Sequence, residues 1–305
     1  MRQIKLGTSD LNVSTIGLGC MRLNGLSTKD ANQVIENALE LGINFFDHAD
    51  MYGQGRSEEL FAEAIEMNPT IREQMIIQTK CGIRNGFFDF SKDHIINSVE
   101  GSLKRLKTDY IDVFLLHRPD ALVEPEEVAE AFDHLYQSGK VRHFGVSNHT
   151  PYQIELLKKH LNQDLIANQL QLSLMFTPMI DEGINMNMED KPAYVRTDGI
   201  LDYSRLHDMT IQPWSPFQYG FFEGVFIDND KFPEVNQKLQ HYADKYNVTK
   251  TTIAIAWLLR HPAKMQPIVG TMNRERLKEI AKAADLTLLR EEWYDLYRAA
   301  GNRLP

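Results

Sequence analysis

Short apolar runs alternate with amphipathic stretches along nearly the whole chain. The runs are rich in β-branched and aromatic residues and often end in a polar residue, which is typical of strands. The stretches between them repeat apolar residues at three- and four-residue spacing, which is typical of helices. Eight runs are predicted to be strands: Ile16–Cys20, Asn44–Asp47, Met75–Lys80, Ile111–Leu116, His143–Val146, Ile166–Gln169, Ile211–Trp214 and Gln266–Val269.

Local signals mark several of the helices between these strands. Ser27 and Asp30 approximate a capping box, and Gly42 ends the same helix. Thr150 and Pro151 combine an N-cap with an N1 proline. The predicted helices are Ser27–Leu41, one around Ser57–Met67, Ser91–Leu106, Glu126–Gln137, one that begins at Thr150, Glu234–Tyr246, Thr251–Arg260, Arg274–Ala284 and Arg290–Ala300.

Regular alternation of strands and helices predicts an α/β fold with a parallel sheet. No G-x-G-x-x-G motif follows the first strand, so a closed (β/α)8 TIM barrel is favoured over an open Rossmann sheet. Arg2–Leu6 and Leu11–Thr15 flank a Gly-Thr-Ser-Asp turn, which predicts a hairpin. We expect this N-terminal β-hairpin to cover the barrel bottom, and residues 1–305 to form a single domain.

The stretch Phe176–Ile200 breaks this rhythm. It contains three methionines and several acidic residues without a clear period. Long irregular stretches in compact domains are usually functional or mobile. We therefore expect a mobile flap over the cofactor or the substrate.

Composition excludes several classes of protein. The formal net charge of −9 disfavours a nucleic-acid partner, because such a partner requires a basic face. The only two cysteines, Cys20 and Cys81, form no C-x-x-C motif. The polar N-terminus and the absence of long apolar runs predict neither a signal peptide nor a membrane span. We expect a cytoplasmic protein without a membrane partner, and a monomer.

Four polar residues follow three consecutive predicted strands: Asp47, Tyr52, Lys80 and His117. In a barrel, the carboxyl ends of the strands meet at the mouth that carries the active site. We expect Asp47 to keep Lys80 charged and Lys80 to lower the pKa of Tyr52 from about 10. Tyr52 would then protonate a carbonyl oxygen that His117 holds in position.

Each of these residues also has a purely structural interpretation. Asp47 and Lys80 could form an ion pair that only stabilises the barrel, and His117 could belong to an ordinary loop. Their coincidence at three neighbouring strand ends favours the catalytic interpretation. No His-x-His motif ends a strand, so no metal site is predicted, although a metal-dependent barrel hydrolase is a rival class.

The later strands end in groups that suit a dinucleotide. Ser147, Asn148 and Gln169 could bind a carboxamide, and Trp214 offers a flat face for a heteroaromatic ring. Gly270-Thr271 precedes a helix that carries Arg274 and Arg276, and such a helix N-terminus with arginines suits a phosphate. Taken singly, each residue could instead be a helix cap, a core residue or a solvated surface residue.

The motifs around these residues resemble the aldo-keto reductase superfamily over nearly the whole chain. The resemblance rests on Gly42–Gly53 with the following Gly-Arg-Ser-Glu, and on Gly139–Asn148. Leu115–Pro119 and Ser138–Asn148 look most like a bacterial branch of predicted oxidoreductases. The resemblance implies a catalytic tetrad of Asp47, Tyr52, Lys80 and His117. It also implies cofactor-binding residues, namely Ser147, Asn148, Gln169, Trp214, Ser215, Phe217, Gly270, Thr271, Arg276 and Glu279.

Several positions depart from the family pattern. His48 stands where a small residue is usual, and His149 where Phe or Tyr is usual. Many members have a lysine at the position of Gly270 and an asparagine at that of Ile280. Arg276 remains to bind a 2′-phosphate, so NADP(H) is expected, with NADH possible.

The expected function is NADP(H)-dependent reduction of an aldehyde or ketone. The alternative is a non-catalytic NADP(H)-binding sensor or regulatory subunit on the same fold. Apolar residues weakly suggest a pocket for aromatic or medium-chain carbonyl substrates: Cys20, Met21, Phe87, Phe88, Trp214 and Tyr219.

Overall fold

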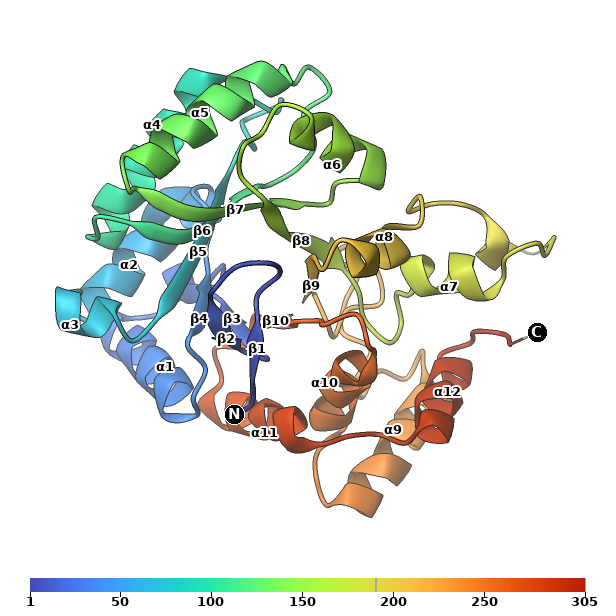
Figure 1. Ribbon diagram of the computed structural model, residues 1–305. Helices are drawn as coiled ribbons and strands as arrows, with labels where there is room; N and C mark the ends of the chain where they lie inside the picture. The colour runs from blue at the N-terminus through green and yellow to red at the C-terminus, as the bar shows by residue number, and fades with distance from the viewer. Residues whose placement is uncertain (190, 305) are drawn as a thin grey trace.

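A computed structural model describes residues 1–189 and 191–304, and eight parallel strands in it form a nearly closed barrel with helices between them (Figure 1). The strand order β10-β3-β4-β5-β6-β7-β8-β9 follows the chain, and β10 returns beside β3. This order confirms the predicted (β/α)8 barrel. The barrel strands are β3 (Gly17–Gly19), β4 (Phe45–Asp47), β5 (Ile76–Cys81), β6 (Ile111–Leu116), β7 (Val141–Ser147), β8 (Leu165–Gln171), β9 (Thr210–Trp214) and β10 (Ile268–Val269).

The last strand is shorter than the predicted Gln266–Val269, because Pro267 has no N–H to donate to a ladder. The residues before β10 still link its neighbours. The amide of Gln266 donates to Ile211 O at 2.9 Å, and Gly17 N donates to Pro267 O at 3.0 Å. These bonds join β9 and β3 to the segment before β10 and hold the barrel seam together.

The N-terminal hairpin consists of β1 (Gln3–Lys5) and β2 (Asn12–Ser14), and lies in front of the central strands in Figure 1. Gly7 N donates to Thr210 Oγ1 at 2.8 Å. Leu6 and Val13 are fully buried in a cluster inside the lower barrel, with Phe45, Val113, Leu115, Ile166, Ala167 and Ile268. The prediction that the hairpin closes the barrel bottom is therefore confirmed.

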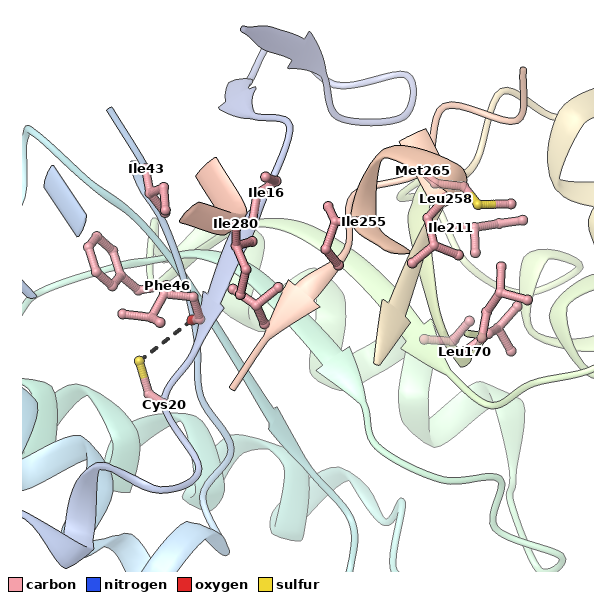
Figure 2. Close-up of a cluster of buried hydrophobic side chains, with 14 of the residues drawn as sticks. Ile16, Cys20, Ile43, Phe46, Leu170, Ile211, Ile255, Leu258, Met265 and Ile280 are labelled. Atoms are coloured by element: carbon pink, nitrogen blue, oxygen red, sulfur yellow. Dashed lines mark hydrogen bonds between the residues drawn. The ribbon is translucent and has the colours of Figure 1, made fainter. Parts of the chain in front are cut away.

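A larger apolar layer fills the space between the strands and the surrounding helices. Figure 2 shows Phe46 and Ile211 from the sheet together with Ile255, Leu258 and Ile280 from the helices. The α-helices are α1 (Thr28–Glu40), α2 (Arg56–Ala64), α3 (Pro69–Arg72), α4 (Lys92–Leu106), α5 (Pro125–Gln137), α6 (Pro151–Lys158), α7 (Pro178–Ile184), α8 (Ile200–Leu206), α9 (Pro233–Tyr246), α10 (Lys250–Arg260), α11 (Arg274–Ala281) and α12 (Arg290–Ala299).

Short 3-10 turns complete the architecture. They are η1 (Leu23–Gly25), η2 (Tyr52–Gly55), η3 (Lys191–Ala193) and η4 (Lys282–Asp285). Within residues 1–189 and 191–304, no helix has both the length and the apolar character that crossing a membrane requires.

The stretch Phe176–Ile200 is more ordered than its sequence predicts. It contains α7, η3 and the first residue of α8. Met179 and Ile180 are buried, and Tyr297 Oη of α12 donates to Asp181 Oδ1 at 2.7 Å. The sequence shows no clear period here because tertiary contacts stabilise a helix too short to produce one.

The rest of this stretch is held by one carboxylate. Glu182 Oε2 accepts from the backbone amides of Arg196 at 3.1 Å and Thr197 at 3.0 Å, and its Oε1 accepts from Gly199 N at 2.6 Å. A mobile flap is therefore limited to the residues between α7 and Arg196, of which residue 190 lies outside the described part of the chain, and it stays a prediction.

Candidate active site

The structure brings the four candidate catalytic residues to one mouth of the barrel. Asp47 ends β4, Lys80 lies near the end of β5, and His117 follows β6 directly. Tyr52 begins η2 just beyond β4. The turn after it, Gly53-Gln54-Gly55, has a left-handed backbone (φ 58, 56 and 90°), and this tight turn follows directly after Tyr52 at the strand ends.

Lys80 is the centre of this group. Its side chain is fully buried, and its Nζ lies 2.8 Å from the Asp47 carboxylate, 2.7 Å from His48 O and 3.2 Å from Tyr52 Oη. These partners use all three ammonium donors. Burial alone would lower the pKa of Lys80, but the charges and hydrogen bonds of Asp47 and Tyr52 outweigh it and raise this pKa. Lys80 therefore stays charged, as expected.

The pKa of Tyr52 shifts in the opposite direction to the expected one. Burial raises this pKa above its usual value of 10, and the opposing effect of the Lys80 ammonium is smaller. The sequence identifies the neighbouring charge but not the desolvation of the hydroxyl, which decides the sign. In the resting site the phenol therefore keeps its proton.

His117 lies edge-on to Tyr52, with ring centroids 5.9 Å apart and planes at 81°. Burial lowers its pKa well below the usual value, and the positive charges of Lys80 and Arg118 add to this effect. A neutral imidazole can donate one hydrogen bond to a substrate oxygen without adding a third positive charge to the mouth.

A chain of buried glutamines supports the tetrad, and sequence reasoning missed most of it. Gln78 Nε2 donates to Asp47 Oδ1 at 2.6 Å, and Gln169 Nε2 donates to the same oxygen at 3.0 Å. Gln212 connects both amides to Gln266, which donates to Ser14 O near the barrel bottom. A polar residue inside an apolar strand, as in Ile-Ile-Gln-Thr-Lys-Cys, is the signal that could have found Gln78.

The candidate carboxamide ligands form one connected group. Ser147 Oγ donates to Gln169 O at 2.9 Å, and Asn148 Nδ2 donates to Ser147 Oγ at 2.8 Å. Trp214 Nε1 donates to Asn148 Oδ1 at 3.1 Å, which orients the indole. The structure thus joins side chains at the ends of β7 and β9 to the backbone of β8, while the Gln169 side chain donates to Asp47 and Gln212.

Backbone strain accompanies this group. Asn148 and Ser215 both have left-handed backbones, with φ of 61° and 52°. This conformation is uncommon for residues other than glycine, least so for asparagine, and it is concentrated at functional sites. Ser215 and Phe217 lie in the connection directly after β9, next to the half-buried Trp214.

The candidate adenosine-phosphate residues lie on the connection from β10 to α11. Arg276 is exposed in the first turn of α11, where the Asn273 side chain caps its amide. Thr271 is buried, and its Oγ1 accepts from Asn273 N at 3.2 Å. The Glu279 carboxylate is already bound by Lys282 Nζ at 2.7 Å. Arg276 and Thr271 therefore fit a phosphate, whereas Glu279 would have to share its carboxylate.

Two histidines that depart from the family pattern are buried. His48 packs edge-on against Phe61 with ring centroids 4.6 Å apart, and burial lowers its pKa to about 3. His149 shares a hydrogen bond of 2.9 Å with Ser147 O and stacks on Phe90, and burial lowers its pKa to about 4. Both are neutral packing residues at neutral pH.

The proposed apolar substrate pocket stays a prediction. A cavity of about 550 Å³ near the mouth is lined by polar residues that include Asp50, Arg84, His94 and Arg105. Cys20 is fully buried, and burial raises the pKa of its thiol well above the usual value. A second cavity, of about 360 Å³, lies between α1 and the start of α11, beside the candidate phosphate segment.

Comparison with known protein families identifies the class of proteins to which this barrel belongs. Residues 15–300 match the model of the aldo/keto reductase family. The chain therefore belongs to the aldo/keto reductase family of oxidoreductases.

Individual proteins show the same similarity. The chain is 35% identical to oxidoreductase YdhF of Escherichia coli, over 98% of each chain. It is 36% identical to 6-dehydroglucose reductase of Novosphingobium aromaticivorans, over 99% of this chain and 96% of that one. The crystal structure of the thermostable aldo-keto reductase Tm1743, in complex with the inhibitor epalrestat, has a TM-score of 0.78 and 25% identity, over 98% and 100% of the two chains.

Proposed function

We propose that this protein reduces an aldehyde or ketone to an alcohol with NADPH. The observation that carries the proposal is the position of Lys80 Nζ, 2.8 Å from the Asp47 carboxylate and 3.2 Å from Tyr52 Oη. A buried ammonium between a carboxylate and a phenol has little use in a barrel that only stabilises itself, because its burial costs free energy. The same group can release one proton and stabilise the charge left behind.

The residues divide the chemistry between them. A nicotinamide cofactor bound at this mouth would supply the hydride for the carbonyl carbon. Tyr52 donates its proton to the carbonyl oxygen as negative charge develops there. Lys80 stabilises the resulting phenolate, and Asp47 keeps Lys80 protonated. The neutral His117 holds the carbonyl oxygen in line with Tyr52 through a hydrogen bond.

The residues around Trp214 fit the nicotinamide. The Trp214 indole can stack on the nicotinamide ring. Asn148 accepts a hydrogen bond from the edge of the indole, so this bond does not occupy either face. Ser147, Asn148 and Gln169 offer hydroxyl and amide groups to the carboxamide. Arg276, exposed at the start of α11, favours a cofactor with a 2′-phosphate.

Cofactor binding and turnover test this proposal together. Tryptophan fluorescence is titrated with NADPH and with NADH, and cofactor oxidation is then followed with a panel of aldehydes and ketones. Tight NADPH binding, weaker NADH binding and carbonyl-dependent oxidation are expected. Binding without any carbonyl-dependent turnover would instead favour the non-catalytic sensor, and no binding of either cofactor would reject both.

A further inference from the structure

Arg118 lies beside the reaction centre but has no role in the tetrad. It follows His117 directly and is half-buried. Its guanidinium carbon lies 5.8 Å from the centroid of the Trp214 ring and 5.7 Å from that of Phe221. The cation therefore lies over Trp214, the candidate platform of the nicotinamide, and is close enough to His117 for its charge to help lower the pKa of that residue.

Among the described residues, no carboxylate pairs with this guanidinium. Within residues 1–189 and 191–304, its side chain forms no ion pair and no hydrogen bond. Asp120 is close in sequence, but its carboxylate accepts from Phe90 N at 3.0 Å and Leu122 N at 2.9 Å. The Asp47 carboxylate is committed to Lys80.

The burial of Arg118 therefore has an uncompensated cost. Burial alone lowers its pKa, with no carboxylate raising it, and the group still stays charged at neutral pH. Contacts with aromatic rings at nearly 6 Å recover only part of the lost hydration. An anion with two oxygens would recover more, because a guanidinium can bind it with two parallel hydrogen bonds.

We propose that Arg118 selects substrates in which the reacting carbonyl is accompanied by a carboxylate. This inference rests on the proposed function and names its substrate class. The carboxylate of the substrate binds the guanidinium, while the carbonyl oxygen binds Tyr52 and His117. Arg118 thus contributes to the choice of substrate, and the tetrad carries out the reaction.

Matched aldehydes test the proposal. The three carboxybenzaldehydes are compared with the three methylbenzaldehydes, which have the same ring and nearly the same shape but no charge. We expect the wild type to prefer at least one carboxylated isomer. Arg118→Met should lower kcat/KM for that isomer by about 10- to 150-fold, the range for a hydrogen bond to a charged group. The neutral aldehydes should change less than threefold.

Two further variants separate binding from general effects. Arg118→Lys keeps the charge but loses the planar fork, and should retain part of the preference. Arg290→Met removes the same charge from an exposed position on α12 and should leave every substrate unchanged.

Three outcomes would overturn the inference. The first is a wild type that treats charged and neutral aldehydes alike. The second is an Arg118→Met variant with an unchanged preference. The third is an equal loss for all substrates together with weaker NADPH binding, which would mean that Arg118 only orients Trp214.

A binding experiment distinguishes this inference from the proposed function. Benzoate and the isosteric benzamide are titrated calorimetrically into the protein with and without NADPH. Saturable benzoate binding that Arg118→Met abolishes supports the anion site even when no aldehyde is turned over. Turnover of neutral aldehydes without benzoate binding rejects the anion site and leaves the reductase proposal standing.

Discussion

The tips of β4 to β6 and the segment from β10 to α11 carry the two halves of the candidate site, and they are built differently. Around Lys80 the polar groups are buried, and hydrogen bonds fix each of them. On the other segment Arg276 is exposed, although Thr271 is buried, and Glu279 is bound to Lys282 directly after its helix. The groups around Lys80, the chemical half, are already held in position. Those around Arg276, the phosphate half, would be ordered only when a phosphate binds.

This difference has a physical cause. A buried charge must be paired, so the Asp47–Lys80 pair tolerates little change. A surface phosphate site can gain or lose one contact at modest cost, because water replaces it. Departures from the family pattern nevertheless occur in both halves. Gly270 lies on the phosphate segment, whereas His48 is buried beside Lys80, and Ile280 is fully buried in the core.

The largest expected effect is on turnover, and it should leave cofactor binding nearly unchanged. Tyr52→Phe removes the proton donor and should lower kcat by about 10²- to 10⁴-fold, while the dissociation constant for NADPH stays within twofold. Steady-state assays and fluorescence titration measure the two quantities. Tyr136→Phe, an exposed tyrosine on α5, is the matched control. A Tyr52→Phe variant with near-normal kcat would reject the assignment of the acid.

Lys80→Met tests how strongly the buried Asp47–Lys80 pair contributes to the stability of the protein. The substitution leaves the Asp47 carboxylate buried with only its amide donors, and should lower the free energy of unfolding by about 3–5 kcal/mol. Urea denaturation measures this change. Adding Asp47→Asn to the variant should restore part of the loss, because no unpaired charge then remains. A loss below 1 kcal/mol would contradict a tightly coupled pair.

Arg276→Met tests the phosphate half. It should weaken NADPH binding by about tenfold and leave NADH binding nearly unchanged, because only NADPH has the 2′-phosphate that a charged hydrogen bond would hold. Lys278→Met removes the same charge from an exposed position on the same helix and serves as the control. Equal weakening of both cofactors would place Arg276 away from the 2′-phosphate.

The smallest effect concerns Asp50, at the edge of the mouth. Burial and the nearby Glu58 raise its pKa from 3.8 to about 6. An acid with a raised pKa in the folded state stabilises the protein below its unfolded pKa, and this stabilisation is lost as pH rises through about 6.

Asp50→Asn should therefore stabilise the protein by about 1–2 kcal/mol at pH 7.5 relative to pH 4, allowing for the partial exposure of the carboxyl. Thermal unfolding at the two pH values measures this difference. Asp93 is exposed and lines the same cavity of about 550 Å³ as Asp50, so Asp93→Asn should show no such pH dependence. The same curve for both variants would mean that the Asp50 carboxyl is well solvated.

Much of the fold could be predicted because its signals are local. Ser27 caps α1 by accepting from Asp30 N, and Thr150 and Gln153 form a full capping box at α6. Polar residues at the ends of successive strands predicted that Asp47, Lys80 and His117 meet, because parallel strands bring their carboxyl ends to the same mouth. The roles of these residues stay predictions until the variants are measured.

Other features depend on contacts between distant segments. The amino-acid sequence by itself determined the rhythm of strands and helices, the hairpin and the identity of the four polar residues at the mouth. Only the tertiary structure decided that Gln78 and Gln169 hold Asp47, that α7 forms against Tyr297, and that Arg118 lies over Trp214 with no carboxylate partner in the described part of the chain. It also decided the sign of the Tyr52 pKa shift, because desolvation depends on what surrounds a group in space, which local sequence patterns do not encode.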